Sequence, residues 1–294
     1  MELIQSLIPI IAPVLICALI GYTWAKSNLP FHSETIGELV MKVGAPCLVI
    51  STLSKVQLSM SDFLAVAQYA LIIALTMTAL GLICIKIWKL NVRTYLGSIL
   101  FANVGNMGLP ICYFAYGDTG LAYGLAYFML ISIAHFSIGV GWMSGDKFLK
   151  SLLTNPIVHS IWIALILLYT ETTLPKWLSN TTDLLAGFTI PLMLIALGVS
   201  LSQLKVEHMS TALKVALLRI LGGFLVAFLL TELLNIEGLI RGILIIQSSM
   251  PVAVFNYLLA QRFNRQPAEI AGMVMASTLL SFATMPLLLW VVLL

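Results

Sequence analysis

Apolar runs of membrane-spanning length follow one another along nearly the whole chain, and short polar connections separate them. A transmembrane helix needs about 20 predominantly apolar residues, so each run predicts one spanning segment. The pattern therefore predicts an all-α polytopic membrane protein with ten transmembrane helices. The expected segments, one to ten in chain order, cover residues 5–25, 34–54, 62–86, 94–117, 120–145, 153–171, 180–202, 211–233, 238–261 and 267–293.

Segment four contains a stretch that disfavours a continuous helix, Asn103-Val-Gly-Asn106-Met-Gly108-Leu-Pro110. Pro110 lacks a backbone donor and clashes with the preceding turn, and the glycines lower the cost of leaving helical angles. Hydrocarbon cannot satisfy the backbone groups that a break frees, so the break must be buried in protein or line a cavity. We therefore expect an interruption near the middle of the membrane.

Segment nine contains a second such stretch, from Gln247 to Pro251. In both segments a phenylalanine and a tyrosine follow the proline by four and six residues. Interrupted helices at corresponding places in two halves of a chain are typical of a transporter's binding site. The alternative is a pair of proline-kinked helices that pack against their neighbours.

The two halves of the chain also resemble each other in the spacing of their prolines. Pro9 and Pro156 begin matching stretches 147 residues apart, and offsets of 145 and 141 residues relate two further pairs of prolines. Because five segments are an odd number, the second copy must cross the membrane in the opposite direction to the first. The sequence predicts an inverted repeat, with residues 1–150 as the first five-helix repeat and residues 151–294 as the second.

Composition excludes a soluble protein, because 60% of the residues are hydrophobic and 9% are charged. Soluble domains carry roughly 25% charged residues. The net charge of +3 comes from basic residues in short loops, so we expect a lipid bilayer and no nucleic acid as a partner. The four cysteines lie in apolar runs without CxxC spacing, so we expect buried side chains and no metal or cofactor site.

Lysines and arginines are divided unevenly between the connections. Nine lie in connections that follow odd-numbered segments, and three lie in the others. Because cytoplasmic loops are rich in these residues, we expect both termini on the non-cytoplasmic side of the inner (plasma) membrane. The nine are Lys26, Lys86, Lys89, Arg93, Lys147, Lys150, Lys205, Arg262 and Arg265, and the three are Lys55, Lys176 and Arg241.

The polar side chains at depth are neutral, with no Asp or Glu near the centre of an expected segment. Each break leaves the N-terminus of a second half-helix inside the protein, where free N–H groups and the helix dipole favour an anion by about 0.3–2 kcal/mol. Two such termini could hold a carboxylate, although the asparagines could instead act only as caps. The expected substrate-binding residues are Asn103, Asn106, Gly108, Pro110, His135, Gln247, Ser248, Ser249, Pro251 and Asn256.

Three ionisable side chains allow two interpretations each. His135 lies deep in segment five, where an ionisable group indicates function, or it is a neutral side chain bonded to a neighbouring helix. Lys42 and Arg219 either extend toward the cytoplasmic surface or touch the ligand. Because no zinc, P-loop or nucleophile-elbow pattern is present, we expect no catalytic site.

In these motifs the sequence resembles the auxin efflux carrier family, and more narrowly its bacterial branch of malonate, malate and other organic-acid permeases. The resemblance rests on residues 101–110 (FANVGNMGLP), 250–257 (MPVAVFNY), 260–263 (AQRF) and 277–281 (STLLS). The family implies a scaffold domain and a transport domain, each drawn from both repeats, with segments four and nine crossing at their breaks. It also implies an elevator-like movement and a dimer formed through the scaffold.

The sequence thus favours a secondary carrier of small organic anions, either mono- or dicarboxylates. The nearest alternative is a proton- or sodium-coupled carrier of another solute class, or a channel-like protein. An intramembrane enzyme would need a nucleophile, a metal cluster or an acid pair at depth, and the sequence shows none.

Overall fold

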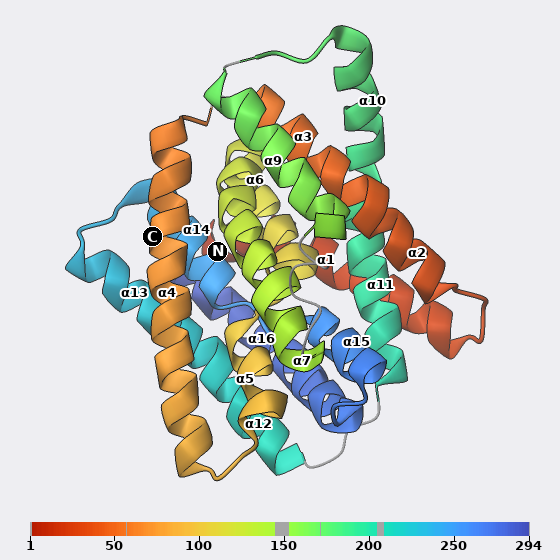
Figure 1. Ribbon diagram of the computed structural model, residues 1–294, viewed down its shortest axis with the longest axis vertical. Helices are drawn as coiled ribbons and strands as arrows, with labels where there is room; N and C mark the ends of the chain where they lie inside the picture. The colour runs from red at the N-terminus through yellow and green to blue at the C-terminus, as the bar shows by residue number, and fades with distance from the viewer. Residues whose placement is uncertain (1, 57, 145–152, 171, 205–208, 294) are drawn as a thin grey trace.

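The computed structural model describes residues 2–56, 58–144, 153–170, 172–204 and 209–293, and these residues fold into helices (Figure 1). Within them, four π-helical turns interrupt or join the α-helices; these are η1 (Val40–Gly44), η2 (Val104–Gly108), η3 (His135–Gly139) and η4 (Leu218–Gly222). The α-helices are α1 (Glu2–Lys26), α2 (Ser33–Leu39), α3 (Ala45–Lys55), α4 (Met60–Ile87), α5 (Val92–Leu100), α6 (Leu109–Ala134), α7 (Val140–Ser144), α9 (Pro156–Tyr169), α10 (Lys176–Gly187), α11 (Thr189–Gln203), α12 (Met209–Leu217), α13 (Gly223–Leu233), α14 (Gly238–Ser248), α15 (Val254–Phe263) and α16 (Pro267–Leu293).

Among the described residues, seven helical stretches are long and apolar enough to cross a membrane, and α9 and α14 are shorter apolar helices. The longest stretch, Val104–Ser144, contains a break at Gly117, whose φ of +64° lies in the left-handed region. Gly117 therefore separates the end of expected segment four from segment five. Helices occupy part of each of the ten expected ranges. Lys147, Lys150 and Lys205, on which the expected orientation partly depends, lie outside the described residues.

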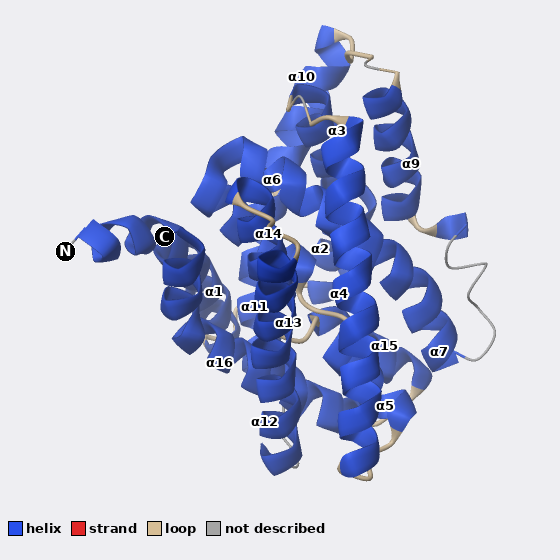
Figure 2. Ribbon diagram, turned by 90° about the vertical axis from the view of Figure 1, so that its left-hand side faces the viewer, coloured by secondary structure: helices blue, strands red, loops and turns tan. Residues whose placement is uncertain are grey.

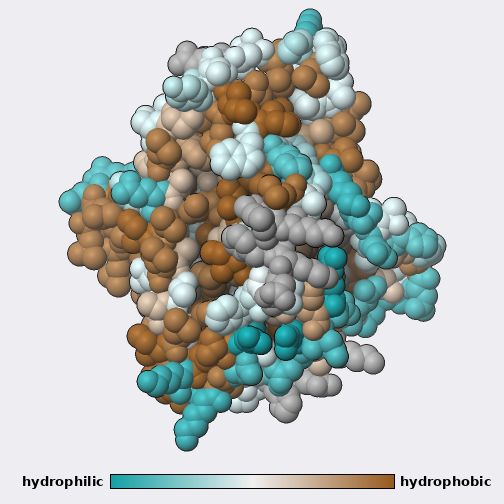
Figure 3. All heavy atoms as spheres, in the orientation of Figure 1, coloured by the Kyte–Doolittle hydropathy of each residue, from teal (hydrophilic) through white to brown (hydrophobic). Residues whose placement is uncertain are grey.

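Apolar side chains cover the outside of this helical body, as a lipid environment requires. Leu75 and Ile87 on α4 are 61% and 69% exposed, and Leu229 on α13 is 55% exposed. Figure 3 shows hydrophobic residues over α4 and α13, with hydrophilic residues gathered toward the ends and one side. Burial of these helices against one another thus leaves an apolar exterior.

The helices form two packed groups. In the first, α1 packs mainly on α11, and α3 packs on α9 and α10. In the second, α4 to α7 and α12 to α16 pack chiefly on one another, with α12 on α16 and α14 on α6. Figure 1 shows α2, α3 and α10 along one side and α4, α12 and α13 along the other, and Figure 2 shows the same body from its side. Each group combines helices from both halves of the chain.

The crossing of α1 and α11 depends on two glycines. A methyl group at Gly198 would collide with the Ala18 carbonyl, and one at Gly21 would collide with the Ile195 carbonyl. Small residues of this kind allow membrane helices to approach closely when no hydrophobic effect drives their association.

Replacing Gly198 by alanine is expected to lower the melting temperature of the detergent-purified protein by roughly 3–10 °C. The overpacked methyl group lowers the free energy of unfolding by about 1–3 kcal/mol. The shift in melting temperature is this loss divided by the unfolding entropy, which is large for a chain of this size. Gly187→Ala is the matched control, because nothing lies within 4 Å of a methyl group at Gly187. Equal melting temperatures for the two variants would show that α1 and α11 do not meet closely at Gly198.

Candidate functional site

The break in segment four lies earlier than the sequence suggested. Helix α5 ends at Leu100, three residues follow in non-helical conformation, and η2 begins at Val104. Pro110 lies in the first turn of α6, beyond the break. The π turn η2 leads directly into α6, so Pro110 lies inside the helix that begins at Val104 and does not end it. The expectation that Pro110 marks the interruption is therefore wrong.

The break in segment nine contains its proline, as expected. Helix α14 ends at Ser248, α15 begins at Val254, and Pro251 lies between them. The two prolines thus occupy different positions relative to their breaks, although the sequences around them look alike.

The two breaks cross and hydrogen-bond to each other. The Asn103 N–H donates to the Pro251 carbonyl at 2.7 Å, and the Ala253 N–H donates to the Phe101 carbonyl at 3.1 Å. These bonds form an antiparallel bridge between Ala102 and Val252. The backbone groups that the breaks free are therefore satisfied inside the protein, as hydrocarbon surroundings demand.

A serine of the last helix completes the crossing. The Val252 N–H donates to Ser277 Oγ at 3.0 Å. Ser277 lies in the STLLS motif of α16 and is fully buried. The motif therefore holds the second break in place from a third helix.

Neither helix that leaves the crossing is capped by a side chain at its N-terminus. Asn103 precedes η2 and Ala253 precedes α15, and neither makes a side-chain capping bond. The first N–H groups of a helix have no partner within it and carry the positive end of the helix dipole. Asn103 is 4% exposed, and its Nδ2 has no hydrogen-bond partner. The interpretation of Asn103 as a side-chain cap is thus wrong, and its amide is a buried donor beside two helix N-termini.

Arg219 binds the ends of the two helices that enter the crossing. Its Nη1 donates to the Ile99 carbonyl at 2.7 Å and to the Leu100 carbonyl at 3.4 Å, at the end of α5. Its Nη2 donates to the Ser248 carbonyl at the end of α14. The side chain is 2% exposed, so extension of Arg219 toward the cytoplasmic surface is wrong. Lys42, by contrast, is exposed and pairs with Glu38 at 2.9 Å.

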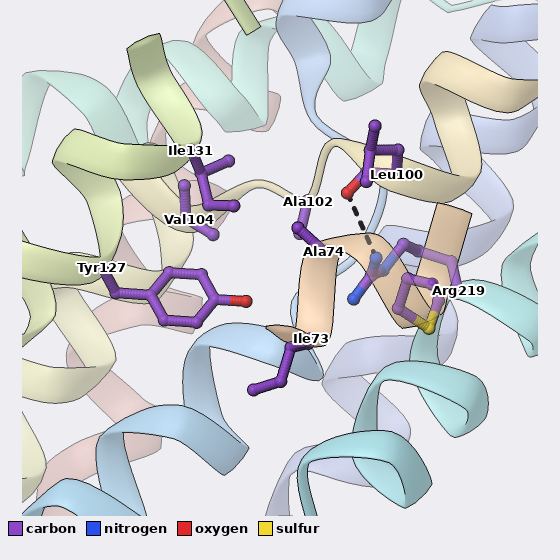
Figure 4. Close-up of a pocket in the computed structure, with 9 residues that line it drawn as sticks. Ile73, Ala74, Leu100, Ala102, Val104, Tyr127, Ile131 and Arg219 are labelled. Atoms are coloured by element: carbon purple, nitrogen blue, oxygen red, sulfur yellow. Dashed lines mark hydrogen bonds between the residues drawn. The ribbon is translucent and has the colours of Figure 1, made fainter. Parts of the chain in front are cut away.

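A small cavity of about 10 Å³ lies between Arg219 and Tyr127 (Figure 4). The Tyr127 hydroxyl points into the space in Figure 4 and lies 3.1 Å from Ser248 Oγ. Ala102 and Val104, on either side of Asn103, also line it. Its volume matches roughly one water molecule. Sequence reasoning missed Tyr127, for which the chain offers no motif.

Gln247 fills the space left by a glycine of the other broken segment. Its Nε2 donates to the Gly124 carbonyl at 3.2 Å, while its Oε1 has no hydrogen-bond partner. A methyl group at Gly108 would collide with that side-chain oxygen. Gly108 and Gln247, both expected at the site, are therefore in contact.

His135 and Asn256 form a second polar cluster beside the crossing. His135 Nε2 lies 3.0 Å from Asn256 Oδ1, and Asn256 Nδ2 donates to the Gly97 and Phe101 carbonyls at 3.2 and 3.3 Å. The His135 ring stacks on Phe101 with a centroid distance of 4.1 Å. His135 thus bonds to a neighbouring helix, as its second interpretation expected. Phe101 joins this cluster to the crossing.

The remaining expected residues differ in their surroundings. Ser249 Oγ donates to the Ile245 carbonyl of its own helix at 2.6 Å, so it serves the end of α14. Asn106 is half-buried within η2, one turn beyond Asn103. Within the described part of the chain, no three His, Cys, Asp or Glu side chains come together as a metal site would require.

The family model described as membrane transport protein matches residues 6–146 and 140–290. These matches cover nearly the whole sequence. The chain belongs to the membrane transport protein family. This confirms the resemblance to the auxin efflux carriers, and it makes the chain a transporter and not an enzyme.

Two archaeal relatives of the family match over almost their full length, and both are named uncharacterized transporters. The protein from Methanocaldococcus jannaschii is 25% identical over 299 residues, covering 95% of this chain and 97% of the relative. The protein from Methanothermobacter thermautotrophicus is 25% identical over 290 residues, covering 93% of this chain and 94% of the relative. The similarity therefore extends over both groups of helices.

Proposed function

We propose that this transporter is a secondary carrier of small organic anions, mono- or dicarboxylates, which bind where the two broken segments cross. The observation that carries this proposal is the crossing itself, which places two uncapped helix N-termini and the unpaired Asn103 amide together in the protein interior.

The charges at the crossing favour an anion. Each helix N-terminus is equivalent to roughly +0.5 charge and each C-terminus to roughly −0.5. The C-termini of α5 and α14 together are balanced by the single charge of Arg219, which bonds to both. The N-termini of η2 and α15 then remain as an unbalanced charge of about +1. One carboxylate group neutralises that charge.

Transport requires the crossing to open, because the cavity beside it holds about one water molecule. We propose that the group containing the crossing moves as one body against α1, α2, α3, α9, α10 and α11, which act as the scaffold. In this proposal the ten segments form an inverted repeat, the protein lies in the inner membrane with both termini outside the cytoplasm, and a homodimer forms through the scaffold.

Counterflow in proteoliposomes tests the substrate class. Vesicles loaded with acetate, lactate, malonate or malate are expected to take up the same labelled carboxylate, whereas vesicles loaded with glucose should not take up labelled glucose. Asn103→Ala is expected to weaken the apparent affinity for the carboxylate by roughly 10- to 100-fold, as loss of one hydrogen bond to a charged group predicts.

Asn180→Ala on the exposed surface of α10 is the control for Asn103→Ala. Exchange of glucose in preference to every carboxylate would favour a carrier of another solute class. Unchanged affinity in the Asn103→Ala protein would remove this residue from the site.

A further inference from the structure

Arg219 binds the kind of backbone groups that hold a coupling cation in carriers with broken helices. In carriers with broken helices, the C-terminal ends of the half-helices and unwound backbone carbonyls coordinate the coupling ion. Here the carbonyls of Ile99 and Ser248, one from each entering half-helix, accept hydrogen bonds from the same guanidinium. None of the ion pairs between described residues includes Arg219.

We propose that Arg219 is a resident cation that takes the place of a coupling ion, so that the carrier works without a sodium ion at the crossing. This inference concerns ion coupling and rests on the proposed function only in assuming that the crossing is the transport site. The guanidinium supplies the positive charge that the two C-termini need, and it remains attached to the protein throughout a transport cycle.

The surrounding backbone is shaped to admit the guanidinium. A methyl group at Gly223, one turn after Arg219, would collide with both the Ser248 carbonyl and Arg219 Nη2. The glycine therefore lets η4 and α13 approach the end of α14 closely enough for the bond to form. Because the Ile99 and Ser248 carbonyls already accept bonds from Arg219, a metal cation would have to compete with the guanidinium for these oxygen ligands.

Arginine suits this role better than lysine. Its planar fork presents donors in several directions and stays charged under all ordinary conditions, so one side chain can bind carbonyls from two helices. The Arg219 Nε has no hydrogen-bond partner.

Thermal unfolding of the detergent-purified protein in the absence of substrate tests the inference. We compare Arg219→Lys, Arg219→Gln and Arg219→Ala in sodium chloride and in choline chloride at equal ionic strength. The wild type should melt at the same temperature in both salts. In choline chloride, Arg219→Gln and Arg219→Ala should melt roughly 5–10 °C below the wild type. The melting temperature of Arg219→Lys should lie between those of the two variants and that of the wild type.

A response to added cations separates this role from simple helix packing. Millimolar guanidinium should raise the melting temperature of Arg219→Ala, while it leaves unchanged or lowers that of the wild type and of Lys214→Ala. Lys214 is the matched control, because it is an exposed cation on the same helical segment. Sodium should likewise stabilise Arg219→Ala relative to choline.

Two outcomes would overturn the inference. One is stabilisation of the wild type by sodium over choline, since a separate ion would then bind. The other is an Arg219→Gln protein that has the same melting temperature as Arg219→Lys, although it lacks the positive charge, and that added sodium or guanidinium does not stabilise. Because these measurements contain no substrate, they can fail while carboxylate counterflow succeeds, and the reverse also holds.

Discussion

Cysteines placed at Ala102 and Val252 are expected to form a disulfide in nearly every molecule, although 150 residues separate them (252 − 102). The two residues face each other in the antiparallel bridge, and the hydrogen bonds flank the pair instead of joining it. Such a pair has a Cα–Cα distance of about 4.5 Å, within the roughly 4.4–6.8 Å range of natural disulfides. Mass spectrometry of the linked peptides after oxidation in native membranes measures the yield.

The background for this experiment lacks the four natural cysteines. The control pair replaces Gly37 on α2 and Val252, which belong to different groups of helices. A high yield for the control pair would show that linkage under these conditions does not depend on proximity. No linkage between Ala102 and Val252 would mean that the two breaks do not cross in the membrane. The carboxylate site would then lose its second helix N-terminus.

Asn256→Leu is expected to lower the melting temperature by roughly 5–10 °C and to abolish carboxylate counterflow. The leucine removes three described hydrogen bonds from a side chain that is 1% exposed. His135 Nε2 is then left buried without its partner, which costs about 1–3 kcal/mol. The Gly97 and Phe101 carbonyls keep their backbone bonds but lose a second one, so the break and the ring beside it both lose a restraint.

A double-mutant cycle with His135→Phe tests whether the effect of Asn256→Leu depends on the bond between Asn256 and His135. Phenylalanine at position 135 keeps a ring that can stack on Phe101 but removes the bond to Asn256. The two changes together should cost less than the sum of their separate effects, as expected for residues in contact. Gln261→Leu, on the exposed face of α15, should leave both melting and counterflow near wild-type values. Strict additivity would contradict a shared role.

The sequence predicted where polarity interrupts the membrane segments, but it located one interruption incorrectly. Proline and glycine signal a break strongly, and in segment nine Pro251 does lie within it. In segment four the chain leaves the helix at Phe101 to Asn103, before the glycines and Pro110. Their backbone preferences are compatible with a helix start as well as with a helix end. Only the pairing with the other break, 150 residues away, decides between these possibilities.

Arg219 was the residue that local reasoning placed least well. Extension of a long cationic side chain to the membrane surface is the usual outcome near a helix end. Arg219, however, lies ten residues after the start of α12, which corresponds to a depth of about 15 Å. That is half of a hydrocarbon core of about 30 Å, too far for the side chain to reach water. This depth alone would have indicated that Arg219 is buried. It would not have identified the ends of α5 and α14 whose carbonyls Arg219 binds.

The four π-helical turns of the described residues have an evolutionary consequence. A π turn contains one residue more than an α turn closed over the same distance, and one residue corresponds to about 100° of rotation around an α-helix. Lys42, Asn106, His135 and Arg219 each lie in one of these turns. Deleting a single residue from η4 would turn Arg219 away from the crossing or rotate all of α13 relative to it. In an alignment of relatives, single-residue gaps at η2, η3 and η4 should therefore mark lineages whose transport sites have changed, even where the flanking sequences agree.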